Sequence, residues 1–105
     1  MVTEKDVKVK VGILKRSKKD LAYYEKEKGK QIQKIEAMRA DKDKYDDHDI
    51  RKQEEVLAET EAMLPESTAR LLAIQQEVET MLQQVPEGSE WPCIDEAKEL
   101  LAANA

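Results

Sequence analysis

Few residues of this chain have the types and spacing that catalysis or metal binding requires. The one histidine, His48, and the one cysteine, Cys93, stand 45 positions apart, so no nucleophile and base are neighbours in the sequence. These two residues cannot supply the four ligands of a structural zinc site, and a single cysteine cannot form an internal disulfide. The sequence contains no glycine-rich phosphate loop. We therefore expect a protein that is not an enzyme and that uses no cofactor or metal.

An acidic segment near the middle of the chain is the nearest approach to a cation site. It lacks the glycine and the terminal glutamate that an EF-hand loop places at fixed spacing. We interpret the segment as part of a turn over residues 41–48 and not as a metal site. Its carboxylates belong to Asp43, Asp46, Asp47 and Asp49.

Basic residues recur along one face of the N-terminal half of the chain. At about 100° per residue of helix, their side chains occupy an arc about 100–200° away from the apolar residue Leu14. The arc lies largely outside the apolar positions, so the residues point outward. Such a basic stripe steers encounters with an acidic partner or simply keeps the helix solvated, and the sequence leaves both interpretations open. The candidate partner-binding residues are Lys15, Arg16, Lys19, Tyr23, Lys26, Lys30 and Lys34.

The basic stripe requires a helix to present it, and the apolar pattern predicts one over about residues 7–40. Apolar side chains recur there mostly at alternating steps of three and four, as expected for one face of a helix. Ser17 and Lys28 are the weak positions of this seam. Its main positions are Val7, Val11, Leu14, Leu21, Tyr24, Ile32, Ile35 and Met38.

A second periodic stretch predicts a helix over about residues 49–84. Its seam runs from Ile50 to Val85 at the same alternating steps. Pro65 lies inside it and costs a helix ~3 kcal/mol, because it removes a backbone donor and crowds the carbonyl of Glu61. The stepping passes Pro65 without losing phase, so we predict one helix that is kinked at Pro65.

A third, shorter helix is predicted over about residues 90–103, after a turn at residues 86–88. Ser89 is the expected cap of this helix, and Pro92 is tolerated in its first turn. We expect one domain over residues 1–105, an all-α, elongated antiparallel three-helix bundle that resembles a coiled-coil rod. The third helix should lie beside the start of the first helix and leave the opposite end two-stranded.

The composition supports a helical chain with a thin core. Of 105 residues, 39% are charged and 40% are hydrophobic, with no Phe and one Trp. Three Gly and three Pro are too few for the many turns of a β-sandwich, and no apolar run is long enough for a membrane span or a secretory signal. Residues 1–44 carry a net charge of +6 and residues 45–105 one of −11. The acidic second half argues against nucleic acid as a partner, and we expect a cytoplasmic protein with no membrane partner.

Several short motifs follow one another along the two long helices. The first group is VKVK at 7–10, KR at 15–16, YEKE at 24–27 and KIEAMRA at 34–40. The second group is DIRKQ at 49–53, LAE at 57–59, MLPE at 63–66 and RL at 70–71. In this order, the chain resembles the tubulin-specific chaperone A family, also called tubulin-folding cofactor A, over about residues 7–85, with a weaker match in the predicted third helix. It departs from the family in a longer turn around residues 45–49 and in Leu-Pro-Glu where Ile-Pro-Asp is usual.

The resemblance implies a non-enzymatic cytosolic chaperone with a three-helix fold and no cofactor. It implies capture of quasi-native β-tubulin after chaperonin release and transfer toward αβ-heterodimer assembly, in association with the cytoskeleton. Other tubulin-folding cofactors would be further partners, and both a monomer and a homodimer are compatible with the family. Tubulin is acidic, which fits the basic stripe. The competing interpretation is a self-associating coiled-coil adaptor without a tubulin role, because the seams are heptad-like.

Overall fold

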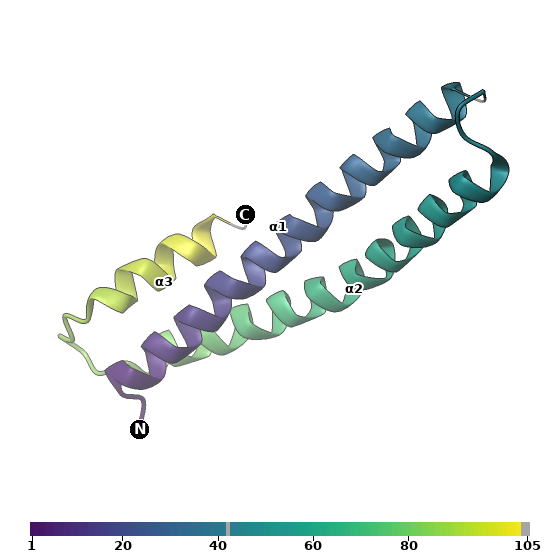
Figure 1. The fold of residues 1–105 in the computed structure, drawn as a ribbon. Coiled ribbons are helices and arrows are strands. Elements are labelled where there is room, and N and C mark those ends of the chain that lie inside the picture. Colours follow the sequence, from purple (N-terminus) through teal and green to yellow (C-terminus); the bar gives the residue numbers. More distant parts are fainter. Residues whose placement is uncertain (42, 104–105) are drawn as a thin grey trace. The chain divides into compact units, whose positions relative to one another are not determined.

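The computed structural model describes residues 1–41 and 43–103, and it contains α-helices joined by turns (Figure 1). The helices of these ranges are α1 (Glu4–Ala40), α2 (Asp47–Gln84) and α3 (Pro92–Ala102). No β-strand occurs in the two described ranges. The predicted all-α class with three helices is therefore confirmed.

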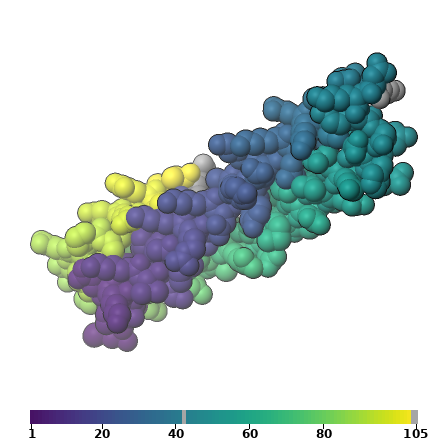
Figure 2. All heavy atoms as spheres, viewed as in Figure 1, coloured from purple at the N-terminus to yellow at the C-terminus, as the bar shows by residue number. Residues whose placement is uncertain are grey.

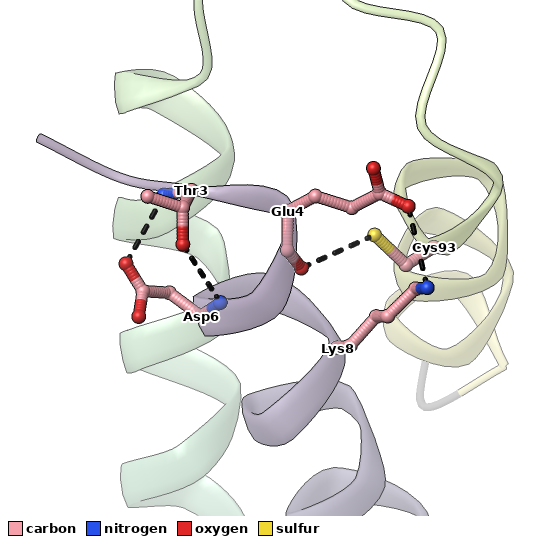
Figure 3. A network of polar contacts seen from close by, with 5 residues as sticks. All are labelled: Thr3, Glu4, Asp6, Lys8 and Cys93. Atoms are coloured by element: carbon pink, nitrogen blue, oxygen red, sulfur yellow. Dashed lines mark hydrogen bonds and ion pairs between the residues drawn. The ribbon is translucent and has the colours of Figure 1, made fainter.

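Helix α1 begins at Glu4, three residues earlier than the apolar pattern predicts, because Thr3 and Asp6 cap it (Figure 3). The backbone N–H of Thr3 donates to Oδ2 of Asp6 at 3.1 Å, and the N–H of Asp6 donates to Oγ1 of Thr3 at 3.2 Å. This reciprocal pair is a capping box. The hydrogen bond from the Thr3 N–H holds the pKa of Asp6 below its ordinary value. Asp6 therefore places a negative charge at the positive end of the helix dipole.

Helix α2 begins with the same arrangement. The N–H of Asp49 donates to Oδ1 of Asp46 at 2.8 Å, and the N–H of Asp46 donates to Oδ2 of Asp49 at 3.4 Å. The bond from the Asp49 N–H lowers the pKa of Asp46. The cap lets the helix begin at Asp47, so the turn predicted over residues 41–48 is too long at its C-terminal end. Lys42 of that predicted turn lies outside the described residues.

Pro65 lies in the interior of α2, and the helix continues through it, as the unbroken phase of the seam predicts. Proline has no N–H, so the carbonyl oxygen of Glu61 lacks the donor that position 65 would otherwise supply. The helix is therefore continuous although this hydrogen bond is missing. The kink expected at Pro65 remains a prediction.

The first compact unit comprises residues 1–19 and 69–105, which are the first half of α1, the second half of α2, and α3. Within this unit α3 lies beside the start of α1, as expected from the sequence (Figure 1). The space-filling view shows the atoms of α3 (yellow) directly against those of the first half of α1 (purple to blue; Figure 2). The buried apolar side chains of the unit are Val7, Val11, Leu14, Leu71, Ile74, Val78, Cys93 and Ala97.

Helix α3 begins at Pro92, and Ser89 does not cap it, contrary to the prediction. The hydroxyl of Ser89 donates instead to the carbonyl oxygen of Pro86 at 2.7 Å, within the turn. Gly88, with φ at 81°, supplies the left-handed residue that this turn requires. Trp91 occupies the N-cap position without a side-chain cap hydrogen bond. Pro92 lies in the first helical turn, where an N–H would have no helical partner.

The second compact unit comprises residues 20–68, which are the second half of α1, the first half of α2 and the connection between them. Among its described residues only Ile35, Met38 and Ser67 are buried. The other seam side chains of this unit are half-buried, because no third helical segment belongs to it. The second unit therefore has two helical segments, as predicted for the part of the chain around residues 41–48.

Candidate partner-binding surface

Four of the seven predicted binding residues are exposed side chains of α1 in the second unit. Tyr23 is 58% exposed and packs edge-on against Tyr24, with the ring centroids 5.5 Å apart and the planes at 71°. The other three are lysines, and none of them forms an ion pair with another described residue. Their ammonium groups are therefore free to meet the carboxylates of a partner. These lysines are Lys26, Lys30 and Lys34.

Lys34 meets two further lysines that the sequence analysis did not single out. Lys34 of α1, Lys44 of the connection and Lys52 of α2 line one open cavity of about 410 Å³. Asp49 and Tyr45 share its wall, and the Lys44 ammonium lies 5.5 Å from the centroid of the Tyr45 ring, within cation–π range. The lining thus contains three cations from three segments and one carboxylate. These lysines share one cavity because of the path of the connection between the helices. The spacing of apolar residues in the sequence does not predict that path.

The remaining three predicted residues are exposed side chains of α1 in the first unit, namely Lys15, Arg16 and Lys19. Lys15 is already engaged, because its ammonium forms an ion pair with Glu96 of α3. The ammonium of Lys18 donates to the carbonyl oxygen of Leu100 in the same helix. Both contacts fasten α3 to α1, so Lys15 has a structural role. The seven residues are divided between two units, and a single stripe through all of them remains a prediction.

Cys93 holds the first turn of α3 against the start of α1 (Figure 3). Its Sγ donates to the carbonyl oxygen of Glu4 at 4.0 Å, and the Glu4 carboxylate pairs with the ammonium of Lys8 at 3.3 Å. Burial raises the pKa of the Cys93 thiol, and the negative charge of Glu4 adds to this effect. The thiol therefore stays protonated at neutral pH, which suits a core residue and not a nucleophile.

A second surface of the first unit was missed by the sequence analysis. Val9 and Ile13 of α1 are 53% and 36% exposed, although both side chains are apolar and β-branched. Val9 and Ile13 each line an open cavity between α1 and α2. The sequence places both residues off the seam, because each follows a seam position, Val7 or Val11, by two places, but this spacing does not say whether a third helix covers them.

The described residues contain no group of three or more His, Cys, Asp or Glu side chains placed to hold a metal ion. Within the same residues, no helix has the length and apolar character needed to cross a membrane. What the described surface offers a partner is cationic charge on α1 and apolar side chains beside it. This combination is typical of protein recognition, in which charge orients the encounter and apolar area holds the complex.

Comparison with known proteins gives one family over nearly the whole chain. The family model of tubulin binding cofactor A matches residues 2–101. The tubulin-specific chaperone A of Gallus gallus is 35% identical over 97 residues, which cover 92% of this chain and 88% of that protein. The matched range extends past residue 85 over nearly all of α3, where the motifs gave only a weaker match.

Two solved structures share the fold. The crystal structure of tubulin folding cofactor A from Arabidopsis thaliana superimposes with a TM-score of 0.83 at 31% identity, covering 95% of this chain and 92% of that one. The human tubulin chaperone cofactor A gives a TM-score of 0.80 at 33% identity, covering 96% of both chains. Sequence and structure therefore agree with the resemblance seen in the motifs, and this chain belongs to the tubulin binding cofactor A family.

Proposed function

We propose that this protein is a tubulin-folding chaperone that captures quasi-native β-tubulin monomers after chaperonin release and hands them on toward αβ-heterodimer assembly. Membership of the tubulin binding cofactor A family supports the tubulin role. We assign the capture surface, meaning the surface that first contacts β-tubulin, to the exposed, unpaired lysines on α1 of the second unit. These are Lys26, Lys30 and Lys34. The protein acts by binding alone, without a catalytic step or a cofactor.

Electrostatic attraction between these lysines and the acidic client starts the capture. Exposed ion pairs contribute only ~0–1 kcal/mol each, so the lysines act mainly on the rate of association and on the orientation of the encounter. Tyr23, exposed on the same helix one turn before Lys26, adds an apolar ring with a polar tip. Lys34, Lys44 and Lys52 extend the cationic surface around the cavity at the end of the hairpin.

Transfer of the client involves further proteins. Other tubulin-folding cofactors take over the captured monomer, in the cytoplasm and in association with the cytoskeleton, and neither nucleic acid nor a membrane takes part. The chaperone works as a monomer or as a homodimer. Membership of the family supports these statements. Sedimentation velocity with and without β-tubulin measures whether the chaperone is a monomer or a homodimer and how many clients it binds.

The capture surface is tested by replacing Lys26, Lys30 and Lys34 together with Gln. Gln and Lys have similar helix propensities, so the helical circular dichroism signal should be unchanged. Association with chaperonin-released β-tubulin should be about tenfold slower at low ionic strength, because the steering charge is lost. The remaining association rate should depend less on salt than that of the wild type. Stopped-flow fluorescence with labelled β-tubulin measures both effects.

A matched control replaces three exposed carboxylates of α2 in the same unit, Glu55, Glu59 and Glu61, with Gln. This variant has the opposite change of charge and should associate at the wild-type rate or slightly faster. Normal association of the lysine variant together with slow association of the glutamate variant would place capture on α2 and overturn the assignment to the basic stripe.

The half-buried seam of the second unit favours one alternative function, that of a self-associating coiled-coil adaptor. Two helical segments without a third leave both flanks of their seam open, and a second copy could cover them. Sedimentation velocity separates the two functions. A stable dimer that does not retain β-tubulin would support the adaptor, whereas a stoichiometric complex with β-tubulin would support the chaperone.

A further inference from the structure

Three open cavities lie between α1 and α2 in the first unit and share lining residues, and together they are called the α1–α2 groove. Their volumes are about 490, 510 and 280 Å³, and Lys10 lines all three. The ammonium of Lys10 pairs with the Glu77 carboxylate at 2.9 Å and joins the two walls of this α1–α2 groove. Asp6, the other carboxylate that lines the groove, accepts the hydrogen bond from the Thr3 N–H. Both negative charges of the groove are therefore already engaged.

The α1–α2 groove and α3 lie on different flanks of α1. Lys15 and Lys18 contact α3. Ile13 and Ser17 line the groove, and at about 100° per residue they lie about 150° further round the helix. None of the described residues of α3 lines any of the three cavities. One flank of α1 is thus covered by a helix of this chain, and the other is open.

The open flank has the apolar surface and the length that a helix needs. Val9 and Ile13 are exposed one helical turn apart on its wall, and Met81 of α2 lines two of the three cavities. From Lys5 to Ser17 the groove follows 12 steps of α1, about 18 Å at the helical rise. A helix of about 12 residues fits this length. Helix α3, which covers the other flank, has 11 residues.

The chemistry of α3 indicates which kind of helix fits beside α1. It is amphipathic, with three acidic side chains and one basic side chain, and Glu96 fastens it to Lys15. The open flank carries the same positive charge. Lys5 lines the groove, and Arg16 lies within about 20° of Val9 round the helix. Neither Lys5 nor Arg16 forms an ion pair with another described residue, so an acidic helix would find two unpaired cations there.

We propose that the α1–α2 groove binds an acidic amphipathic helix of the captured client, with the apolar face over Val9 and Ile13 and the carboxylates toward Lys5 and Arg16. The mode is helix-in-groove recognition, in which apolar side chains spaced by three and four residues supply the contact area. The inference rests on the proposed function for the nature of the client. The groove then shields an apolar face of the client until assembly, while the basic stripe accelerates the encounter.

The probe is a lactam-bridged peptide of about 14 residues with Leu on one face and Glu on both sides of that face. The bridge is needed because a free peptide of this length is marginally helical in water. Fluorescence anisotropy should show saturable binding of the labelled peptide to the full chain. Replacing Val9 and Ile13 together with Gln should weaken binding at least about tenfold, because the apolar contact is removed. Lys5→Glu should weaken binding and reduce its salt dependence.

The matched control is Leu72→Gln, which changes an apolar side chain that is 54% exposed on α2 of the same unit and lines none of the three cavities. It should bind the peptide within about twofold of the wild type. A peptide with Lys in place of every Glu should bind at least about tenfold more weakly. Equal binding of the two peptides, or equal binding by the Val9/Ile13 variant and the wild type, would overturn the proposal.

Two further outcomes separate this proposal from others. If the Val9/Ile13 variant converts a dimer to a monomer in sedimentation velocity, the occupant is a second copy of this chain and the proposal is wrong. If that variant captures β-tubulin normally while the lysine variant does not, the role of the groove in binding the client is wrong and the proposed function is unaffected. If the wild-type protein binds the peptide but captures no tubulin, the proposed function is wrong and the α1–α2 groove still binds an acidic helix.

Discussion

Cys93 is the residue whose chemistry the fold changes most. It is 4% exposed, and burial together with the Glu4 carboxylate raises the pKa of its thiol. Because the thiolate is the nucleophile, both effects slow its reactions. In the native protein at about pH 8.5, alkylation of Cys93 by iodoacetamide should be at least about tenfold slower than in concentrated guanidinium. Mass spectrometry over time measures both rates, and equal rates would show that the thiol is not held in the core.

At the scale of one helix, Pro65 shows how much a missing backbone hydrogen bond lowers the free energy of unfolding. Replacing it with Ala restores the N–H that faces the Glu61 carbonyl in α2 and relieves the crowding of the ring. The free energy of unfolding should rise by about 1–3 kcal/mol, and the Tm should rise with it. Thermal melting followed by circular dichroism measures the change.

The control for this change is Ala58→Pro, at an exposed position in the interior of the same helix. It introduces the defect that Pro65→Ala removes, so it should lower the free energy of unfolding by about 3 kcal/mol. A lower Tm for Pro65→Ala would mean that the packing of α2 requires the bend that proline imposes.

Cooperativity is the property of the whole molecule that follows from its helices. Both α1 and α2 run through the two compact units. Unfolding of either unit therefore breaks helices that continue into the other unit. We predict one unfolding transition for residues 1–105, as expected of a single domain. Trp91 reports on the first unit, whereas circular dichroism reports on all three helices. The two melting curves should coincide, and a loss of helix at temperatures where Trp91 fluorescence is unchanged would contradict the single domain.

The positions of the helices follow from local periodicity, and their ends do not. Val7, Leu14 and Val78 are the largest fully buried side chains, and all three lie on the predicted seams, because a seam is set by the 3.6-residue turn alone. The early starts of α1 and α2 come from capping pairs, Thr3 with Asp6 and Asp46 with Asp49. A cap is a local hydrogen bond between short polar side chains and the backbone, and it leaves no trace in the apolar pattern.

By itself the sequence determined which side chains of α1 are exposed, because the angle around a helix depends only on spacing. Every predicted binding residue is exposed for this reason. Tertiary structure alone decided which of them are engaged. Lys15 pairs with Glu96, far along the chain, and Lys34 lines one cavity with Lys44 and Lys52 of other segments.

The exposure of Val9 and Ile13 was decided in the same way. An apolar pair off the seam is covered or open according to the flank on which a third helix docks. Helix α3 docks where Lys15 pairs with the Glu96 carboxylate and Lys18 donates to the carbonyl oxygen of Leu100, and it therefore leaves the opposite flank uncovered. That choice depends on contacts between residues more than 80 positions apart, which no local pattern in the sequence encodes.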